Sequence, residues 1–121
     1  MALVLGGETT VTLTGADGRG GRNGELALAA ARELAAGLPG QEEVVLCLAT
    51  DGEDGTTGTA GAAVDGGAWE AIRRAGIDPE VSLARHDSLP ALEKAPGALL
   101  RTGVTGTNVG DLALYLRRPS S

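Results

Sequence analysis

Aromatic side chains are nearly absent from this 121-residue sequence, which has one Trp, one Tyr and no Phe. Proteins that bind single-stranded nucleic acids stack the bases on such rings, so this sequence offers no stacking platform. The net charge of −6 also opposes attraction to a phosphate backbone. The composition therefore predicts no nucleic-acid partner.

Cysteine is scarce, and long apolar runs are missing. Cys47 is the single cysteine, so no disulfide forms within the chain, and its apolar neighbours predict a buried thiol. No apolar run approaches the length of a bilayer span, and Met1 is followed by neither a basic nor a long apolar segment. We therefore expect a cytoplasmic protein with no membrane partner.

Several phosphate-binding and metal motifs are also missing. Lys94 is the only lysine, and no Gly-Lys-Ser/Thr sequence occurs, which excludes a Walker loop. Gly18 and Gly20 are not followed by a third glycine at the required place, which excludes the dinucleotide fingerprint. His86 is the single histidine and has no cysteine cluster with which to bind zinc.

Glycine is abundant, with 20 residues, and it concentrates in three polar loops at positions 18–23, 51–58 and 102–111. A glycine-rich loop brings backbone N–H groups close to a ligand because no Cβ blocks the approach. The three loops together predict one assembled site for a phosphorylated or acidic small molecule. The alternative for each loop alone is an ordinary turn.

Predicted strands alternate with predicted helices, which favours one α/β domain over residues 1–121. The threonine-rich start predicts a hairpin-like pair and so a mixed β-sheet flanked by helices. Residues 43–49 form a near-continuous apolar run, typical of a central strand buried on both faces. The expected strands are 3–5, 9–14, 43–49 and 112–116, and the expected helices are 23–38, 69–75, 78–83 and 89–94. Residues 59–64 are small and apolar and fit either a strand or a close-packed connector. Asn23 is expected to cap the first helix.

Two arginines, Arg19 and Arg22, lie in a glycine-rich loop that runs into this predicted helix. The N–H groups and the dipole of a helix N-terminus favour an anion, and arginine binds carboxylate or phosphate through two parallel hydrogen bonds. The alternative is a solvated basic loop, or pairing of these arginines with nearby acids.

Three carboxylates, Asp51, Glu53 and Asp54, follow the predicted central strand. Magnesium is commonly held by one or two carboxylates together with phosphate oxygens. The alternative is an acidic turn in which aspartate accepts local backbone N–H groups. Asn108 is either a turn residue or a ligand contact, and Asp111 is either a cap or turn acceptor or a ligand contact.

Five segments taken in order resemble a known family. They are Gly6-Gly7-Glu8-Thr9-Thr10-Val11, Gly18-Arg19-Gly20-Gly21-Arg22-Asn23-x-Glu25-Leu26-Ala27-Leu28, Thr50-Asp51-Gly52-x-Asp54-Gly55, Ala60-Gly61-Ala62-x-Val64-Asp65-Gly66 and Thr102-Gly103-x-Thr105-Gly106-Thr107-Asn108-Val109-x-Asp111-Leu112. The chain resembles the MOFRL domain, the C-terminal domain of class II glycerate 2-kinases, over roughly Leu3 to Leu116. Members of this family are also labelled hydroxypyruvate reductases.

The resemblance implies phosphorylation of D-glycerate at its 2-hydroxyl by ATP, with Mg²⁺. It also implies a partner, the N-terminal Rossmann-like domain of glycerate kinase, which forms the other side of the active-site cleft and supplies a catalytic lysine. No such domain lies in residues 1–121, and Lys94 is outside every motif. We therefore expect this domain to be inactive alone and to self-associate weakly through the surface that the partner would cover.

The resemblance also implies roles for individual residues. Arg22 and then Arg19 are the catalytic candidates, because a cation stabilises the charge of the transferred phosphoryl group. The metal candidates are Asp51 and Asp54. The substrate or nucleotide candidates are Glu8, Thr9, Asn23, Thr105, Thr107 and Asn108, of which Glu8 is also a candidate for the metal. The sequence departs from the family pattern at Gly24, Gly58, His86 and Gly110.

Two other functions remain open at this point. One is a ligand-binding or regulatory module that keeps the fold without catalysis. The other is the hydroxypyruvate reductase of the family label, against which the missing dinucleotide fingerprint argues.

Overall fold

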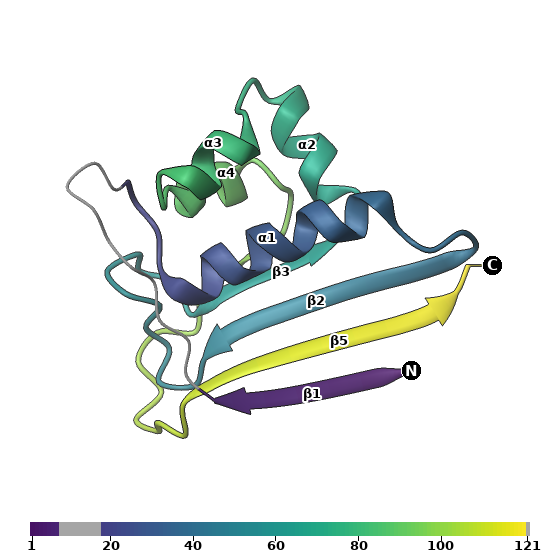
Figure 1. Ribbon diagram of the computed structural model, residues 1–121. Coiled ribbons are helices and arrows are strands. Elements are labelled where there is room, and N and C mark those ends of the chain that lie inside the picture. The colour runs from purple at the N-terminus through teal and green to yellow at the C-terminus, as the bar shows by residue number, and fades with distance from the viewer. Residues whose placement is uncertain (8–17, 121) are drawn as a thin grey trace.

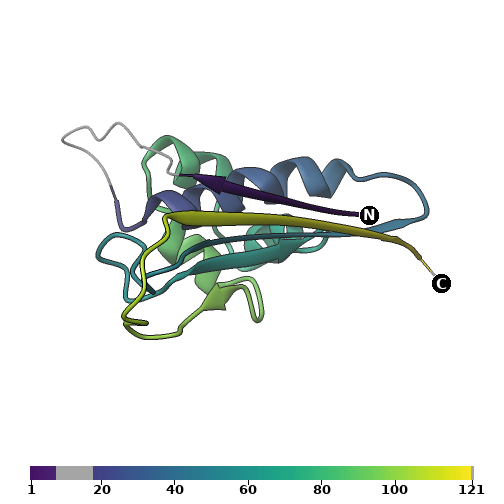
Figure 2. The same ribbon diagram turned by 90° about the horizontal axis from the view of Figure 1, so that it is seen from below.

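The computed structural model describes residues 1–7 and 18–120, which form a five-stranded sheet with helices gathered over one of its faces (Figure 1). The strands are β1 (Ala2–Gly7), β2 (Gln41–Ala49), β3 (Gly61–Asp65), β4 (Leu99–Leu100) and β5 (Asp111–Pro119), in the spatial order β1-β5-β2-β3-β4. The described helices are α1 (Arg22–Ala36), α2 (Ala68–Arg74), α3 (Pro79–Ala84) and α4 (Ser88–Glu93). The sheet twists from β1 to β4, as the view from below shows (Figure 2).

The predicted α/β class, with a sheet flanked by helices, is confirmed. Each of the four described strand pairings is antiparallel, so the parallel pair that a mixed sheet contains is not among them. β2 and β3 follow one another through a loop without a crossover helix, and such a connection pairs strands antiparallel. The register places Val45 between Tyr115 and Val64, and this row faces the helices.

Helix α1 packs on the sheet through small and aliphatic side chains. Ala27, Leu28 and Ala31 are fully buried and belong to the same core cluster as Cys47 and Ala62 of the sheet. Their small volume lets the helix approach the strands closely. The predicted buried thiol of Cys47 is thereby confirmed.

The helix boundaries differ slightly from the prediction. Helix α1 runs from Arg22 to Ala36 and ends at Gly37, whose φ of 41° suits glycine. Helix α3 begins as expected, with the Asp78 carboxylate accepting the Glu80 N–H at 3.0 Å. The strand expected at 9–14 lies outside the described residues. In the described part of the chain, no helix is both long and apolar enough to cross a bilayer.

Strand β2 is central, as predicted, but the prediction that it is buried on both faces is wrong for the described residues taken alone. Val45, Cys47 and Ala49 face the helices, whereas the alternate residues Val44, Leu46 and Leu48 face away from them. Val44 is 38% exposed. An apolar strand therefore has one face that the described residues leave uncovered.

Candidate functional site

The three glycine-rich loops identified in the sequence approach one end of the sheet, where β2 ends and β5 begins (Figure 1). Ala49 and Asp111 are directly opposite one another in the register. Beyond them, the Thr50 hydroxyl donates to the carbonyl of Gly110 at 2.7 Å and accepts the N–H of Val109 at 2.9 Å. The β2–β3 and β4–β5 loops are therefore joined by side-chain hydrogen bonds.

Further contacts bind these two loops together. The N–H of Thr105 donates to the Asp51 carbonyl at 3.1 Å, and its hydroxyl donates to the Thr50 carbonyl at 2.6 Å. Gly52 has a φ of 86°, and a Cβ there would lie 2.0 Å from the carbonyl oxygen of Gly103. Only glycine allows so close a passage of the two backbones.

The third loop contributes Arg22, the first residue of α1. Its Nε donates to Asp111 Oδ2 at 2.5 Å and its Nη2 to Asp111 Oδ1 at 2.8 Å. Asp111 is only 7% exposed, whereas the Arg22 side chain is 29% exposed. The pair fixes the plane of the guanidinium while part of the arginine stays accessible to solvent.

The N-terminus of α1 is capped by a residue from another loop. Gly21 is the N-cap and provides no side-chain hydrogen bond, so the prediction that Asn23 caps this helix is wrong. Asp54, which is 1% exposed, accepts the N–H groups of Asn23 and Gly24 at 2.8 Å each. Its carboxylate therefore occupies the position that an anion would take at a helix N-terminus.

The other predicted residues are placed as follows. Asn23 is buried and its amide lies 3.3 Å from Asp54 Oδ1, while Asp51 Oδ1 accepts the Glu53 N–H at 2.9 Å. Thr107 and Asn108 are exposed in the β4–β5 loop, and Asn108 Oδ1 accepts the Gly110 N–H at 3.0 Å. Glu8 and Thr9 lie outside the described residues. Among those that are described, no three His, Cys, Asp or Glu side chains form a metal-binding group.

The backbone of Arg19 contacts the segment at the start of α4, where its carbonyl accepts the Leu89 N–H at 2.8 Å. The Arg19 side chain is exposed, and the Arg19 N–H donates to the Asp87 carboxylate at 2.8 Å. The structure therefore brings Arg22, Asp51, Thr105 and the 107–108 segment to one end of the sheet, and links Arg19 to the loop that precedes α4.

Sequence reasoning missed a contact beside this loop. His86 adopts a φ of 52°, and its Nδ1 lies 2.5 Å from Glu25 Oε1 on α1. The next buried polar residue, Ser88, has no partner for its hydroxyl within the described residues. The sequence distance of 61 residues between His86 and Glu25 left no local signal for their pairing.

Cys47 is buried on β2 and does not provide a nucleophile. Burial, and to a lesser extent the negative charges of Asp54 and Asp111, together raise the pKa of its thiol to about 11. The thiol therefore stays protonated at neutral pH.

The fold and the loop cluster define a two-layer α/β domain that presents polar, glycine-rich loops and an arginine–carboxylate pair at one end of its sheet. The chain belongs to the MOFRL family, whose model matches residues 1–111.

Named relatives agree with this assignment. A D-glycerate 2-kinase of Thermotoga maritima is 52% identical over 116 residues, a match that covers 95% of this chain and 26% of the relative. A glycerate 2-kinase of Pyrococcus horikoshii is 46% identical over 116 residues, covering 96% and 25% of the two chains. The crystal structure of a glycerate kinase from T. maritima superposes with a TM-score of 0.86 at 49% identity, over 95% of this chain and 27% of that one. This chain thus spans about a quarter of the length of the relatives that it matches.

Proposed function

We propose that this chain is the MOFRL domain of an ATP-dependent D-glycerate 2-kinase and forms one wall of its active site. The observation that carries the proposal is the Arg22–Asp111 pair beside the two joined loops. The other wall, with the groups that this domain lacks, belongs to the N-terminal kinase domain. We accordingly place the protein in the cytoplasm, where ATP is abundant.

Arg22 is suited to stabilise anionic oxygens in this reaction. Phosphoryl transfer depends mainly on positioning and on compensation of negative charge. The guanidinium is held in one orientation by Asp111, so little reorganisation is needed when a phosphate or the glycerate carboxylate approaches. Arg19 is a second, more exposed source of positive charge in the loop that precedes α1.

The polar loop residues are suited to orient the substrate. Thr105, Thr107 and Asn108 are exposed, and the glycines between them allow backbone N–H groups to contact a ligand. By resemblance, Glu8 and Thr9 contribute from the segment that follows β1. Asn23 contributes indirectly, because its side-chain amide donates a hydrogen bond to Asp54 and holds that carboxylate in place.

The residues present also fit Mg²⁺, which would be held by Asp51 together with phosphate oxygens. Magnesium needs only one or two protein carboxylates when the substrate supplies phosphate ligands. The carboxylate of Asp54 already accepts hydrogen bonds from two N–H groups of α1. We therefore propose that Asp54 contributes to metal binding indirectly, by holding the loop that carries Asp51. The metal would supply neutralisation of phosphate charge.

An amide NMR titration of the chain with Mg-ATP, and then with D-glycerate, tests the proposal. We expect shifts at Arg22, Asp51 and 102–110 that are lost in Arg22→Lys, which cannot bind an anion bidentately. Arg32→Lys is the control, because Arg32 is exposed on the same helix and pairs with Glu80. Shifts equal in both variants, or confined to another surface, would contradict the proposal.

A further inference from the structure

The sheet has an open face on the side away from the helices, defined here by seven aliphatic side chains. The register aligns Val4 with Leu114 and Leu114 with Leu46 in one row across β1, β5 and β2. In the two neighbouring rows the aliphatic pairs lie on β5 and β2 alone, and β1 contributes Ala2 and Gly6. The open sheet face consists of Val4, Val44, Leu46, Leu48, Leu112, Leu114 and Leu116.

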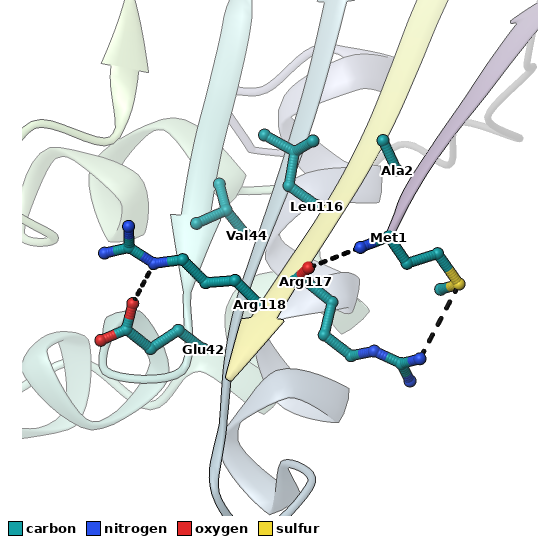
Figure 3. A pocket seen from close by; sticks show the side chains of 7 residues that line it. All are labelled: Met1, Ala2, Glu42, Val44, Leu116, Arg117 and Arg118. Carbon is teal, nitrogen blue, oxygen red and sulfur yellow. Dashed lines mark hydrogen bonds and ion pairs between the residues drawn. The ribbon is translucent and has the colours of Figure 1, made fainter. Parts of the chain in front are cut away.

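This face is uncovered within the described residues. Val4 is 59% exposed, Val44 38% and Leu116 43%. Figure 3 shows Ala2, Val44 and Leu116 on neighbouring strands, with α1 behind the sheet. They line a hollow of about 550 Å³, whose rim carries the ion pair between Arg118 and Glu42. Three rows two residues apart extend for about 14 Å along the strands.

An apolar surface of this size indicates an interface. Contiguous apolar patches on soluble proteins mark contact sites, and an ion pair at the edge is typical of the polar rim of such a site. The alternation that an exposed sheet face would show is missing from β2, whose sequence Val44 to Ala49 is apolar on both sides. The sequence of β2 is thus that of a strand covered on both faces.

We infer that the open sheet face docks onto an apolar surface of the remaining part of the kinase chain. This inference rests on the proposed function, because the segment that would cover the open sheet face belongs to the proposed kinase. About three quarters of the length of the P. horikoshii relative lies outside its match to this chain, since the match covers 25% of it. A covalently joined segment has an effective concentration in the millimolar range, which favours it over a second copy of this chain as the occupant.

Thiol labelling measures whether the face is covered. Val44→Cys and Val4→Cys place a thiol on the open sheet face, and Val81→Cys on α3 is the control, since Val81 is 46% exposed on the helical side. Cys47 contributes little background because it is buried with its pKa raised to about 11. The variants are compared in the 121-residue chain and in a fusion where this chain replaces the matching quarter of the T. maritima kinase.

We expect the cysteines at 4 and 44 to react at least about 10-fold more slowly in the fusion than in the 121-residue chain, with position 81 unchanged. Rates at positions 4 and 44 that are the same in a folded fusion as in the 121-residue chain would overturn the inference. Protection in the fusion that instead rises with the concentration of the fusion would also overturn it, because the occupant would be a second copy.

Kinase activity of the same fusion separates this inference from the proposed function. Protection without glycerate phosphorylation supports the docking surface and counts against the catalytic proposal. Phosphorylation without protection supports the catalytic proposal and rejects the docking surface.

Discussion

Asp111 begins β5 beside the first turn of α1, and its carboxylate binds both Nε and Nη2 of Arg22, a residue 89 positions earlier in the chain. In this pair the buried carboxylate and the partly exposed arginine have different roles. Asp111 fixes the geometry, and Arg22 presents positive charge at the joined loops.

Replacing this carboxylate tests its structural contribution. Asp111→Asn leaves Arg22 with a weaker acceptor, and we expect the free energy of unfolding to fall by about 1–3 kcal/mol. Glu42→Gln is the control, since Glu42 and Arg118 are 49% and 79% exposed and such pairs contribute about 0–1 kcal/mol. Urea denaturation of both variants measures the difference, and equal losses would contradict the assigned role.

Asp54 provides a second test, because it caps α1 from a loop distant in sequence. Asp54→Ala leaves two N–H groups at the start of α1 without their acceptor, and we expect a loss of about 1–3 kcal/mol. Asp65→Ala removes an exposed aspartate that accepts the Gly67 N–H, and should change stability by no more than about 0.5 kcal/mol. Thermal unfolding followed by circular dichroism distinguishes the two, and similar midpoints would argue against the cap.

Gly52 and Gly58 form a matched pair for the contact between the loops. Both have positive φ, 86° and 75°, but a Cβ at Gly52 would collide with the Gly103 carbonyl, whereas a Cβ at Gly58 meets no heavy atom within 4 Å. Gly52→Ala should therefore cost about 1–3 kcal/mol more than Gly58→Ala, through displacement of the β4–β5 loop. The NMR resonances of 102–110 should shift in the first variant only. A shift of the same size in both would show that the loops do not touch at Gly52.

The raised pKa of Cys47 predicts that the free energy of unfolding decreases at alkaline pH. Its pKa is raised from 9.0 to about 11 in the folded chain, so folding favours the protonated thiol. The resulting stabilisation is fully present below pH 9.0 and is lost as pH rises toward about 11. Urea denaturation between these pH values should show a steeper decline in the parent chain than in Cys47→Ala.

Tyr115 also titrates at alkaline pH, but it does not confound the comparison between the parent chain and Cys47→Ala. Its pKa is raised chiefly by the hydrogen bond to Glu43, so it acts in the same direction, but it is present in both proteins. Parallel declines in the parent chain and in Cys47→Ala would show that Cys47 does not contribute.

Local sequence signals located most elements of the fold. Asp78 followed by Pro79 marks the start of α3 because both signals act within one helical turn. The alanine-rich periodicity of α1 and the apolar run of β2 predicted their type for the same reason. The cap of α1 could not be read in this way, because its acceptor, Asp54, comes from a loop 30 residues beyond Gly24.

The family motifs, the polar loops and the apolar character of β2 could all be read from the chain, since each depends on residues close together in sequence. Folding in three dimensions was needed to pair Asp111 with Arg22, to place Asp54 as the cap of α1, and to cover one face of β2. Those outcomes depend on which strands become neighbours, and the antiparallel order β1-β5-β2-β3-β4 brings together residues whose separation in sequence carries no local signal. Strand pairing and the packing of α1 on the sheet, rather than propensity along the chain, therefore assembled the site.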